Sequence, residues 1–345
     1  MRQKELSQGE RVLYICPLIY RTDMLVWAIF IGFILLFLAL DLGVFNKKAH
    51  VIKSKEAAIW TSVWVSLALG FSGVIWWLFS SDMLPNPTGL TPDKAVLKYV
   101  TGYLIELSLS IDNVFVIAVI FKSFRIPSLY QHRVLFWGIL GAIVFRALMI
   151  VFGVALINKF DWIVYVFGVF LIYTAFKMLK SDDSEFNPKE SFIFKRLRKV
   201  LPFTAFIEGE KFFIRRMGIR IATPLFMALI IIELTDILFA LDSIPAILAI
   251  TADPFIVFSS NILAILGLRS MYFLISRMLS KFRFINYSLV VILTYVGLKM
   301  IFAHFIEIPE WLSLLIIGLS LGGGILASVL IKDKELDDRL DEEED

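Results

Sequence analysis

The segment Glu106-Leu-Ser-Leu-Ser-Ile-Asp112-Asn113 places two carboxylates and three small polar side chains inside a stretch that is otherwise apolar enough to cross a bilayer. A second segment, Asp236-Ile-Leu-Phe-Ala-Leu-Asp242-Ser243, repeats the same spacing of two acids followed by a small polar residue. A charged residue near the centre of a membrane helix costs about 2.5 to 3.5 kcal/mol on insertion scales. Both segments are therefore predicted to face a partner, a cavity or an ion.

Oxygen ligands of these kinds suit hard divalent cations such as Mn²⁺, Ca²⁺ and Mg²⁺, whereas Zn²⁺ and Cu⁺ call for Cys and His. The chain has one cysteine and three histidines, so we expect no thiolate-rich metal site and no cofactor other than a cation carried as substrate. The carboxylates could also carry protons, which would allow exchange of the metal for H⁺. The predicted ligands are Glu106, Asp112, Asn113, Asp236, Asp242 and Ser243. The accessory candidates are Asp41, Glu233, Ser110, Arg146 and Arg269.

A structural alternative is that the acids only pair with bases inside the membrane. The predicted spans hold six acids, namely Asp41, Glu106, Asp112, Glu233, Asp236 and Asp242. They face two deep bases, Arg146 and Arg269, with Lys177 and Lys299 nearer the span ends. Even with all four bases used, two acids remain, which favours a cation site. For the two arginines, a clamp on a carboxylate and a gating role both stay open.

The elements that must position these residues are membrane helices. Of the 345 residues, 59% are hydrophobic and 19% charged, and the mean hydropathy is +0.80, which indicates a polytopic membrane protein. The apolar runs lack the period-two alternation of barrel strands, so the predicted fold class is all-α. We expect about nine spans, at 24–45, 57–79, 99–121, 134–157, 161–179, 224–250, 255–275, 285–305 and 311–331.

The chain also contains an internal repeat, of about 99–179 and about 224–305. Besides the acidic segments, Phe145-Arg146-Ala147-Leu148-Met149 corresponds to Leu268-Arg269-Ser270-Met271-Tyr272, and Tyr173 to Met178 corresponds to Tyr295 to Met300. The two three-helix units enter the membrane from opposite sides, which is the inverted repeat of many secondary transporters, with the site near the midplane. From a rise of about 1.5 Å per residue, we predict two tiers, Glu106 with Asp242 and Asp112 with Asp236.

Helical periodicity complicates these tiers. At about 100° per residue, Glu106, Ser110 and Asn113 share one face of their helix while Asp112 lies on another. The same split separates Asp236 and Ser243 from Asp242. Two interpretations remain open: the segments unwind locally, which Pro245 would favour, or the two faces serve successive positions on a path.

Charge outside the spans predicts the orientation. Lys and Arg are concentrated in the loops after the first, third, fifth and seventh spans, whereas the loops after the second, fourth, sixth and eighth carry only Lys94, Lys98 and Lys159. The positive-inside rule then puts the N-terminus outside and the C-terminus in the cytoplasm, in a cell or inner membrane. The basic residues of the N-terminal arm, 1–23, conflict with this orientation.

Two segments on the cytoplasmic side of the predicted transmembrane domain, 24–331, complete the chain. The loop 181–223 is basic with interleaved aromatics, and we favour contact with lipid headgroups over nucleic-acid binding. The tail 332–345 is acidic and predicted to be a solvated end. We expect no nucleic-acid partner.

The residues quoted above resemble a known family. Thr101 to Asn113, Ala222 to Pro245, Thr251 to Asn261 and Leu266 to Arg269 are similar to the signature segments of the TerC family of integral membrane proteins. The resemblance covers about residues 24–331 and implies membership of the LysE-like transporter group. It also implies efflux of Mn²⁺, as in several members including the alkali-inducible branch; the family name comes from tellurium resistance. Residue by residue, the resemblance supports the six predicted ligands, and Asp41 resembles the family's first-span aspartate.

These observations lead us to expect an exporter of a divalent cation, with Mn²⁺ as the substrate that the resemblance implies, and not an enzyme. An intramembrane diaspartyl protease would need a Gly-x-Gly-Asp context, which is missing at Asp112 and Asp242. A membrane scaffold in metal or tellurium stress and a cation channel remain as alternatives. The scaffold predicts that Asp112→Asn and Asp242→Asn leave function intact.

Overall fold

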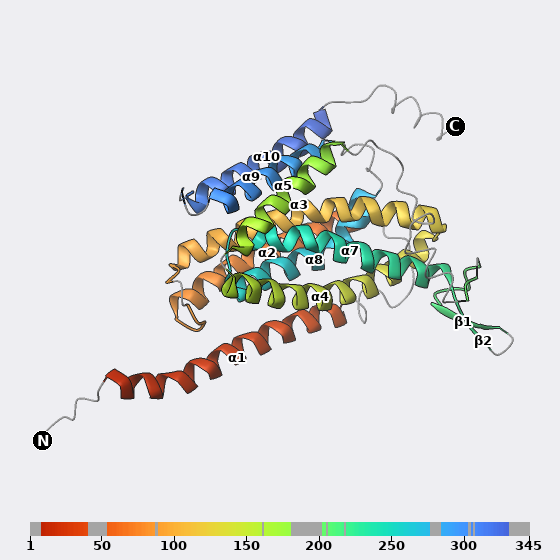
Figure 1. Cartoon of the computed structure of the whole chain (residues 1–345). Coiled ribbons are helices and arrows are strands. Elements are labelled where there is room, and N and C mark those ends of the chain that lie inside the picture. The colour runs from red at the N-terminus through yellow and green to blue at the C-terminus, as the bar shows by residue number, and fades with distance from the viewer. Residues whose placement is uncertain are drawn as a thin grey trace, which may run out of the picture. The chain divides into compact units, whose positions relative to one another are not determined.

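The computed structural model describes residues 8–40, 54–86, 89–160, 162–180, 202–204, 206–216, 219–276, 284–302, 305 and 308–330 (Figure 1). Its helices are α1 (Gln8–Leu40), α2 (Ser54–Ser80), α3 (Pro92–Phe124), α4 (Ser128–Lys159), α5 (Ile163–Lys180), α7 (Pro224–Leu248), α8 (Pro254–Ile275), α9 (Ile285–Phe302) and α10 (Glu310–Leu330). Two short strands, β1 (Phe213–Arg216) and β2 (Ile219–Ala222), are the exception. The all-α polytopic membrane fold is confirmed.

Seven described helices are long and apolar enough to cross a membrane, and Asp23–Ala39 and Tyr287–Phe302 are shorter apolar helices. The predicted count of nine spans stays a prediction. Helix α1 begins at Gln8, so it takes in residues 8–22 of the segment that we expected to be an arm. The acidic tail and residues 181–201 of the basic loop lie outside the described residues.

The described chain divides into two compact units, one within 1–50 and 70–96, the other within 51–69 and 97–345. In the first unit, Phe30 of α1 packs against Phe71 of α2 with ring centroids 5.3 Å apart. The indole of Trp76 donates a hydrogen bond of 3.2 Å to Asp93 at the start of α3. The second unit contains nearly all of the predicted site.

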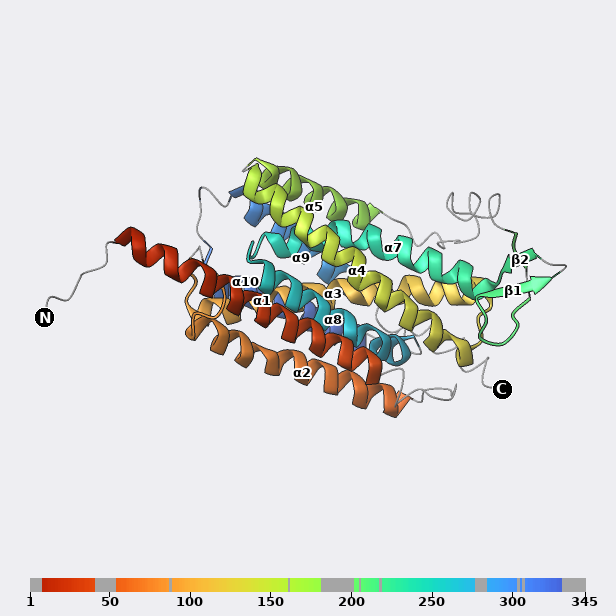
Figure 2. The ribbon, with the colours of Figure 1, turned by 90° about the horizontal axis from the view of Figure 1, so that it is seen from below.

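Successive helices of the second unit alternate in direction. Helices α3, α5 and α8 run toward the end where β1 and β2 lie, and α4, α7 and α9 run away from it (Figures 1 and 2). Each helix of the first predicted repeat thus runs opposite to its counterpart in the second, α3 to α7, α4 to α8 and α5 to α9. These directions are the ones an inverted repeat requires, while the repeat itself stays a prediction.

Helices α5 and α9 approach closely through two glycines. A Cβ at Gly168 would lie 2.9 Å from the carbonyl oxygen of Gly297, and a Cβ at Gly297 would lie 2.8 Å from that of Gly168. Small residues at helix crossings let backbones pack directly in membranes, where van der Waals contact rather than the hydrophobic effect drives helix association. This crossing holds the third helices of the two predicted repeats together.

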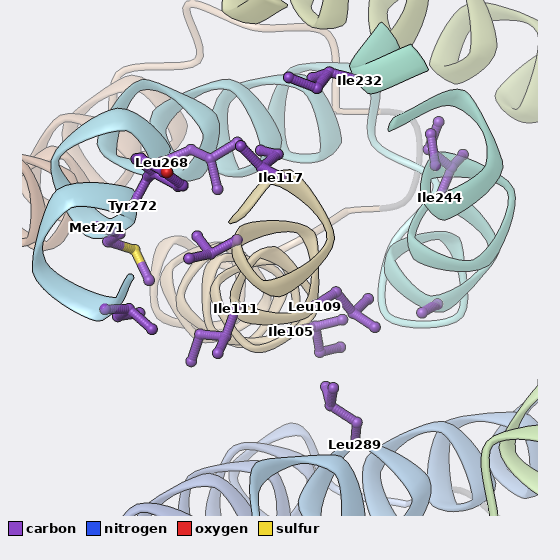
Figure 3. Close-up of a cluster of buried hydrophobic side chains, with 14 of the residues drawn as sticks. Ile105, Leu109, Ile111, Ile117, Ile232, Ile244, Leu268, Met271, Tyr272 and Leu289 are labelled. Atoms are coloured by element: carbon purple, nitrogen blue, oxygen red, sulfur yellow. The ribbon is translucent and has the colours of Figure 1, made fainter. Parts of the chain in front are cut away.

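In the core of the second unit, side chains of α3, α7 and α8 pack together with residues of α4, α5, α9 and α10 (Figure 3). Ile105 and Leu109 of α3, Ile244 of α7 and Met271 of α8 are among its buried side chains. Nearly all of α8 is buried, including the consecutive polar residues Ser259, Ser260 and Asn261. A helix that is buried all round lies at the centre of its bundle, so polar groups on α8 must find partners inside the protein.

The strands form an antiparallel hairpin that fixes the start of α7. Their register runs from Phe213 opposite Ala222 to Arg216 opposite Ile219. Arg133 of α4 binds Glu210, just before β1, at 2.9 Å and lies over the ring of Phe212. Part of the predicted basic loop is therefore a structured element attached near the start of α4.

Candidate cation site

Arg146 of α4 joins the two acidic segments. Its guanidinium forms an ion pair with Glu106 of α3 through Nη1. It also donates two hydrogen bonds to Asp236 of α7, from Nη2 at 3.0 Å and from Nε at 3.2 Å. The exposed fractions of the Arg146 and Glu106 side chains are 1% and 0%. A single buried cation thus bridges one carboxylate from each predicted repeat.

Two amides complete this cluster. Asn261 of α8 accepts a 3.0 Å hydrogen bond from Arg146 Nη1 and donates one of 3.1 Å to Glu106, which fixes the orientation of its amide. Asn113 of α3 donates to Asp236 at 3.2 Å. Its own Oδ1 is buried and has no hydrogen-bond partner among the described residues. We call Glu106, Asn113, Arg146, Asp236 and Asn261 the central cluster.

The helical faces explain which predicted ligands meet. Helices α3 and α7 are continuous, so the segments do not unwind. The face of α3 with Glu106 and Asn113 meets the face of α7 with Asp236, and the Ser243 hydroxyl lies near Glu106 without hydrogen-bond geometry. Of the two interpretations, the structure supports separate faces.

Asp242 lies on the other face of α7. It accepts a hydrogen bond of 3.0 Å from the hydroxyl of Thr174 on α5, away from Arg146. The predicted pairing of Glu106 with Asp242 is therefore wrong, because Glu106 shares Arg146 with Asp236. The predicted pairing of Asp112 with Asp236 stays a prediction, since the side chain of Asp112 lies outside the described residues. The tiers were derived from depth alone, and depth does not say which face of a helix a residue occupies.

The remaining predicted residues either lie around the central cluster or fall outside the described residues. The side chain of Asp112 and all of Asp41 are outside the described residues. Ser110 is buried on α3, and its hydroxyl has no hydrogen-bond partner in the described part. Glu233, one turn before Asp236, rests where Gly141 of α4 leaves room, since a Cβ there would overlap its carboxylate. Arg269 is buried on α8.

A small cavity reaches the cluster from the hairpin end of the bundle. It has a volume of about 20 Å³ and is bordered by Asn113 and Asp236. Its other walls come from α3 beyond Asn113, from α4 before Arg146, from α7 on both sides of Asp236 and from Leu268 of α8. Such a volume holds about one water molecule. Asp236 therefore stands between the cavity on one side and Arg146 on the other.

The central cluster contains two acidic side chains, Glu106 and Asp236, and one basic side chain, Arg146. With both carboxylates ionised, its formal charge is negative, and each charge is costly to bury unless it is paired and hydrogen-bonded. In the described part of the chain, no three Asp, Glu, His or Cys side chains converge as a metal site. The guanidinium lies between the two carboxylates and contacts both.

Sequence reasoning missed Asn261 and Thr174. Asn261 is a fully buried amide that follows two buried serines on α8, and it bonds to both Glu106 and Arg146. The signal was the run Ser259-Ser260-Asn261 in the middle of an apolar span. Thr174 lies within the repeated motif that begins at Tyr173, but a threonine on an apolar helix is an ordinary residue, so it gave no usable signal.

Comparisons with known proteins agree with this architecture. The profile of the Integral membrane protein TerC family matches residues 91–336. An uncharacterized membrane protein from Myxococcus xanthus is 51% identical over 304 residues, 88% of this chain and 92% of that protein. A protein from Escherichia coli (strain K12), described as "Putative membrane-bound redox modulator Alx", is 44% identical over 291 residues, 84% of this chain and 89% of its own length.

An uncharacterized membrane protein from Rickettsia bellii is 42% identical over 89% of this chain and 97% of its own length. No solved structure matches the chain. The family profile covers well over half of the chain, and the region it matches contains every residue of the central cluster. This chain belongs to the TerC family of integral membrane proteins.

Proposed function

We propose that this protein exports a divalent metal cation across the cell membrane, with Mn²⁺ as the expected substrate, through the central cluster. The observation that carries the proposal is the cluster itself: two carboxylates and two amides, buried between membrane helices, with only one cationic side chain among them. Ionisable groups inside a membrane are expensive to maintain and mark ion pathways in most proteins that keep them.

The donor atoms support a hard cation. Carboxylate and amide oxygens are the ligands of Mn²⁺, Mg²⁺ and Ca²⁺, and the cluster offers neither thiolate nor imidazole. The free Oδ1 of Asn113 and the hydroxyl of Ser110 would add neutral oxygens. Asp112, Asp242 and Ser243 are further proposed ligands, with Asp242 at a second position along the path beside Thr174.

The cavity and the predicted orientation suit the proposed direction of transport, out of the cytoplasm. The cavity lies on the hairpin side of the cluster, which the positive charges of the loop 181–223 predict to be cytoplasmic. A cation from the cytoplasm would reach Asp236 and Asn113 first. Carboxylates that give up a cation can take a proton, so antiport with H⁺ is the coupling we propose to test, with Glu233 as a further carboxylate on the same helix.

Other functions make different predictions. In a channel, the ion flux would not saturate at low ion concentrations and would not require exchange of one ion for another. A scaffold would tolerate neutral substitutions at Glu106 and Asp236. The name of Alx raises a redox role. A dithiol reaction within one chain has no support here, because the sequence contains a single cysteine, Cys16.

Flux into liposomes tests the proposal. The purified protein would be reconstituted and uptake of Mn²⁺, Ca²⁺ and Mg²⁺ measured with and without a pH gradient, for wild type, Asp236→Asn and Asp112→Asn. We expect saturable Mn²⁺ uptake by wild type that is driven by the gradient and lost in both variants. Ser259→Ala is the matched control, since that hydroxyl bonds to the carbonyl of Ile256 in its own helix. Absence of Mn²⁺ flux in wild type would defeat the proposal, and flux indifferent to pH would remove proton coupling.

A further inference from the structure

Arg146 binds the same two carboxylates that are proposed to bind the transported cation. Its guanidinium pairs with Glu106 and makes two hydrogen bonds to Asp236, so it satisfies both carboxylates that the proposed cation needs. A divalent cation added to this arrangement would compete with Arg146 for the same oxygens. We propose that Arg146 is a tethered counter-ion that replaces the transported cation while the site is empty. The inference rests on the export function proposed above.

The position of the cavity indicates which carboxylate an entering cation would contact first. Asp236 accepts from Arg146 and also borders the cavity, whereas Arg146 is absent from the cavity wall. A cation in the cavity therefore meets Asp236 and the free Oδ1 of Asn113 before it meets the guanidinium. The cation can bind Asp236 first, and it can bind Glu106 only after the ion pair between Arg146 and Glu106 has broken. Asn261, which bonds to both Arg146 and Glu106, holds the empty arrangement together.

The charge of an ion then determines whether it can displace Arg146 from the carboxylates. The two carboxylates already hold one positive charge from Arg146. A monovalent ion offers no more charge than the guanidinium and lacks its directed hydrogen bonds, whereas a divalent ion neutralises both carboxylates at once. Arg146 thus raises the charge that an ion needs in order to bind, and it excludes Na⁺ and K⁺ without a size filter.

Charge also bears on the return step of the cycle. An empty carrier with two bare carboxylates would have to carry them through the low-dielectric centre of the membrane. With Arg146 in place, one of the two charges is neutralised and all three groups are hydrogen-bonded. A proton taken up in the proposed antiport would neutralise the other carboxylate. The protein without its metal can then change its accessibility, which net transport requires and which exchange of one bound cation for another does not.

The test compares net efflux with exchange in liposomes, using Mn²⁺ itself as the probe. In Arg146→Gln, we expect Mn²⁺ to bind at least about tenfold more tightly, because a competing buried charge is gone. Na⁺ should now inhibit that binding. Exchange of Mn²⁺ on one side for Mn²⁺ on the other should persist, while net efflux into Mn²⁺-free solution should fall at least about tenfold.

Arg146→Lys separates the effect of the positive charge from that of the guanidinium hydrogen bonds. It also tests the inference if the glutamine variant does not fold. Lysine keeps the charge but loses the fork to Asp236, so net efflux should persist with Mn²⁺ affinity equal to or above that of wild type. A purely structural clamp predicts instead that affinity, exchange and net efflux fall together in both variants, and that result would overturn the inference. Wild type that neither binds nor exchanges Mn²⁺ would overturn the export function as well.

Discussion

Asn261→Leu tests the central cluster without assuming transport. Leucine has a similar size, but it removes the hydrogen bond from Arg146 at 3.0 Å and the one to Glu106 at 3.1 Å. Both partners remain charged and buried. Hydrogen bonds to charged groups contribute about 1.5 to 3 kcal/mol each in soluble proteins, and bonds between membrane helices average about 0.6 kcal/mol. For the two bonds together we therefore expect the free energy of unfolding to fall by about 1 to 6 kcal/mol.

Reversible unfolding of the purified protein in mixed micelles with increasing SDS, followed by tryptophan fluorescence, would measure this loss. Ser259→Ala is the matched control, because Ser259 is equally buried two residues away and its hydroxyl donates a hydrogen bond of 3.3 Å to the carbonyl of Ile256 in its own helix. The control should stay within about 0.5 kcal/mol of wild type. If Asn261→Leu is as stable as Ser259→Ala, then Asn261 does not bridge Arg146 and Glu106, and the geometry of the cluster is wrong.

Three other substitutions test the frame around the cluster. Gly297→Leu should prevent the α5 and α9 contact and lower the yield of folded protein, since even a Cβ would lie 2.8 Å from the Gly168 oxygen; Gly318→Leu, with open space at its Cβ, should not. Glu310→Gln should cost about 1 to 3 kcal/mol of unfolding free energy, because Glu310 binds Lys98 at 2.8 Å and Lys299 at 3.4 Å. An unchanged SDS midpoint would show that these ion pairs contribute nothing. Thr174→Val should weaken Mn²⁺ transport less than Asp242→Asn does, because it removes only the hydroxyl that orients that carboxylate; equal or greater loss would make Thr174 a ligand itself.

Much of the site follows from local geometry that sequence reveals. The spacing of Glu106 and Asn113, and of Asp236 and Ser243, is two helical turns, so each pair had to share a face of an unbroken helix. The excess of acidic over basic residues in the predicted spans could also be counted from the sequence. Depth in the membrane was also estimated from helical rise, but it could not decide partners, and the pairing of Glu106 with Asp242 failed for that reason.

The rest depended on how helices pack sideways. Nothing in the span of α4 says that Arg146 faces both α3 and α7, and a neutral amide such as Asn261 does not stand out until its helix proves to be buried on every side. The hairpin was missed because the aromatic and basic residues of β1 and β2 also fit a segment at the lipid surface. Its attachment to Arg133 is a tertiary contact that composition does not reveal.

The central claim is that the carboxylates of α3 and α7 form one cation site, and equilibrium binding of Mn²⁺ to the purified protein tests it most directly. Electron paramagnetic resonance measures the free ion, whose signal falls as Mn²⁺ binds. The account predicts saturable binding by wild type, and affinity at least about tenfold weaker in both Glu106→Gln and Asp236→Asn, because each removes a charged ligand. Binding of unchanged affinity in both variants would contradict it.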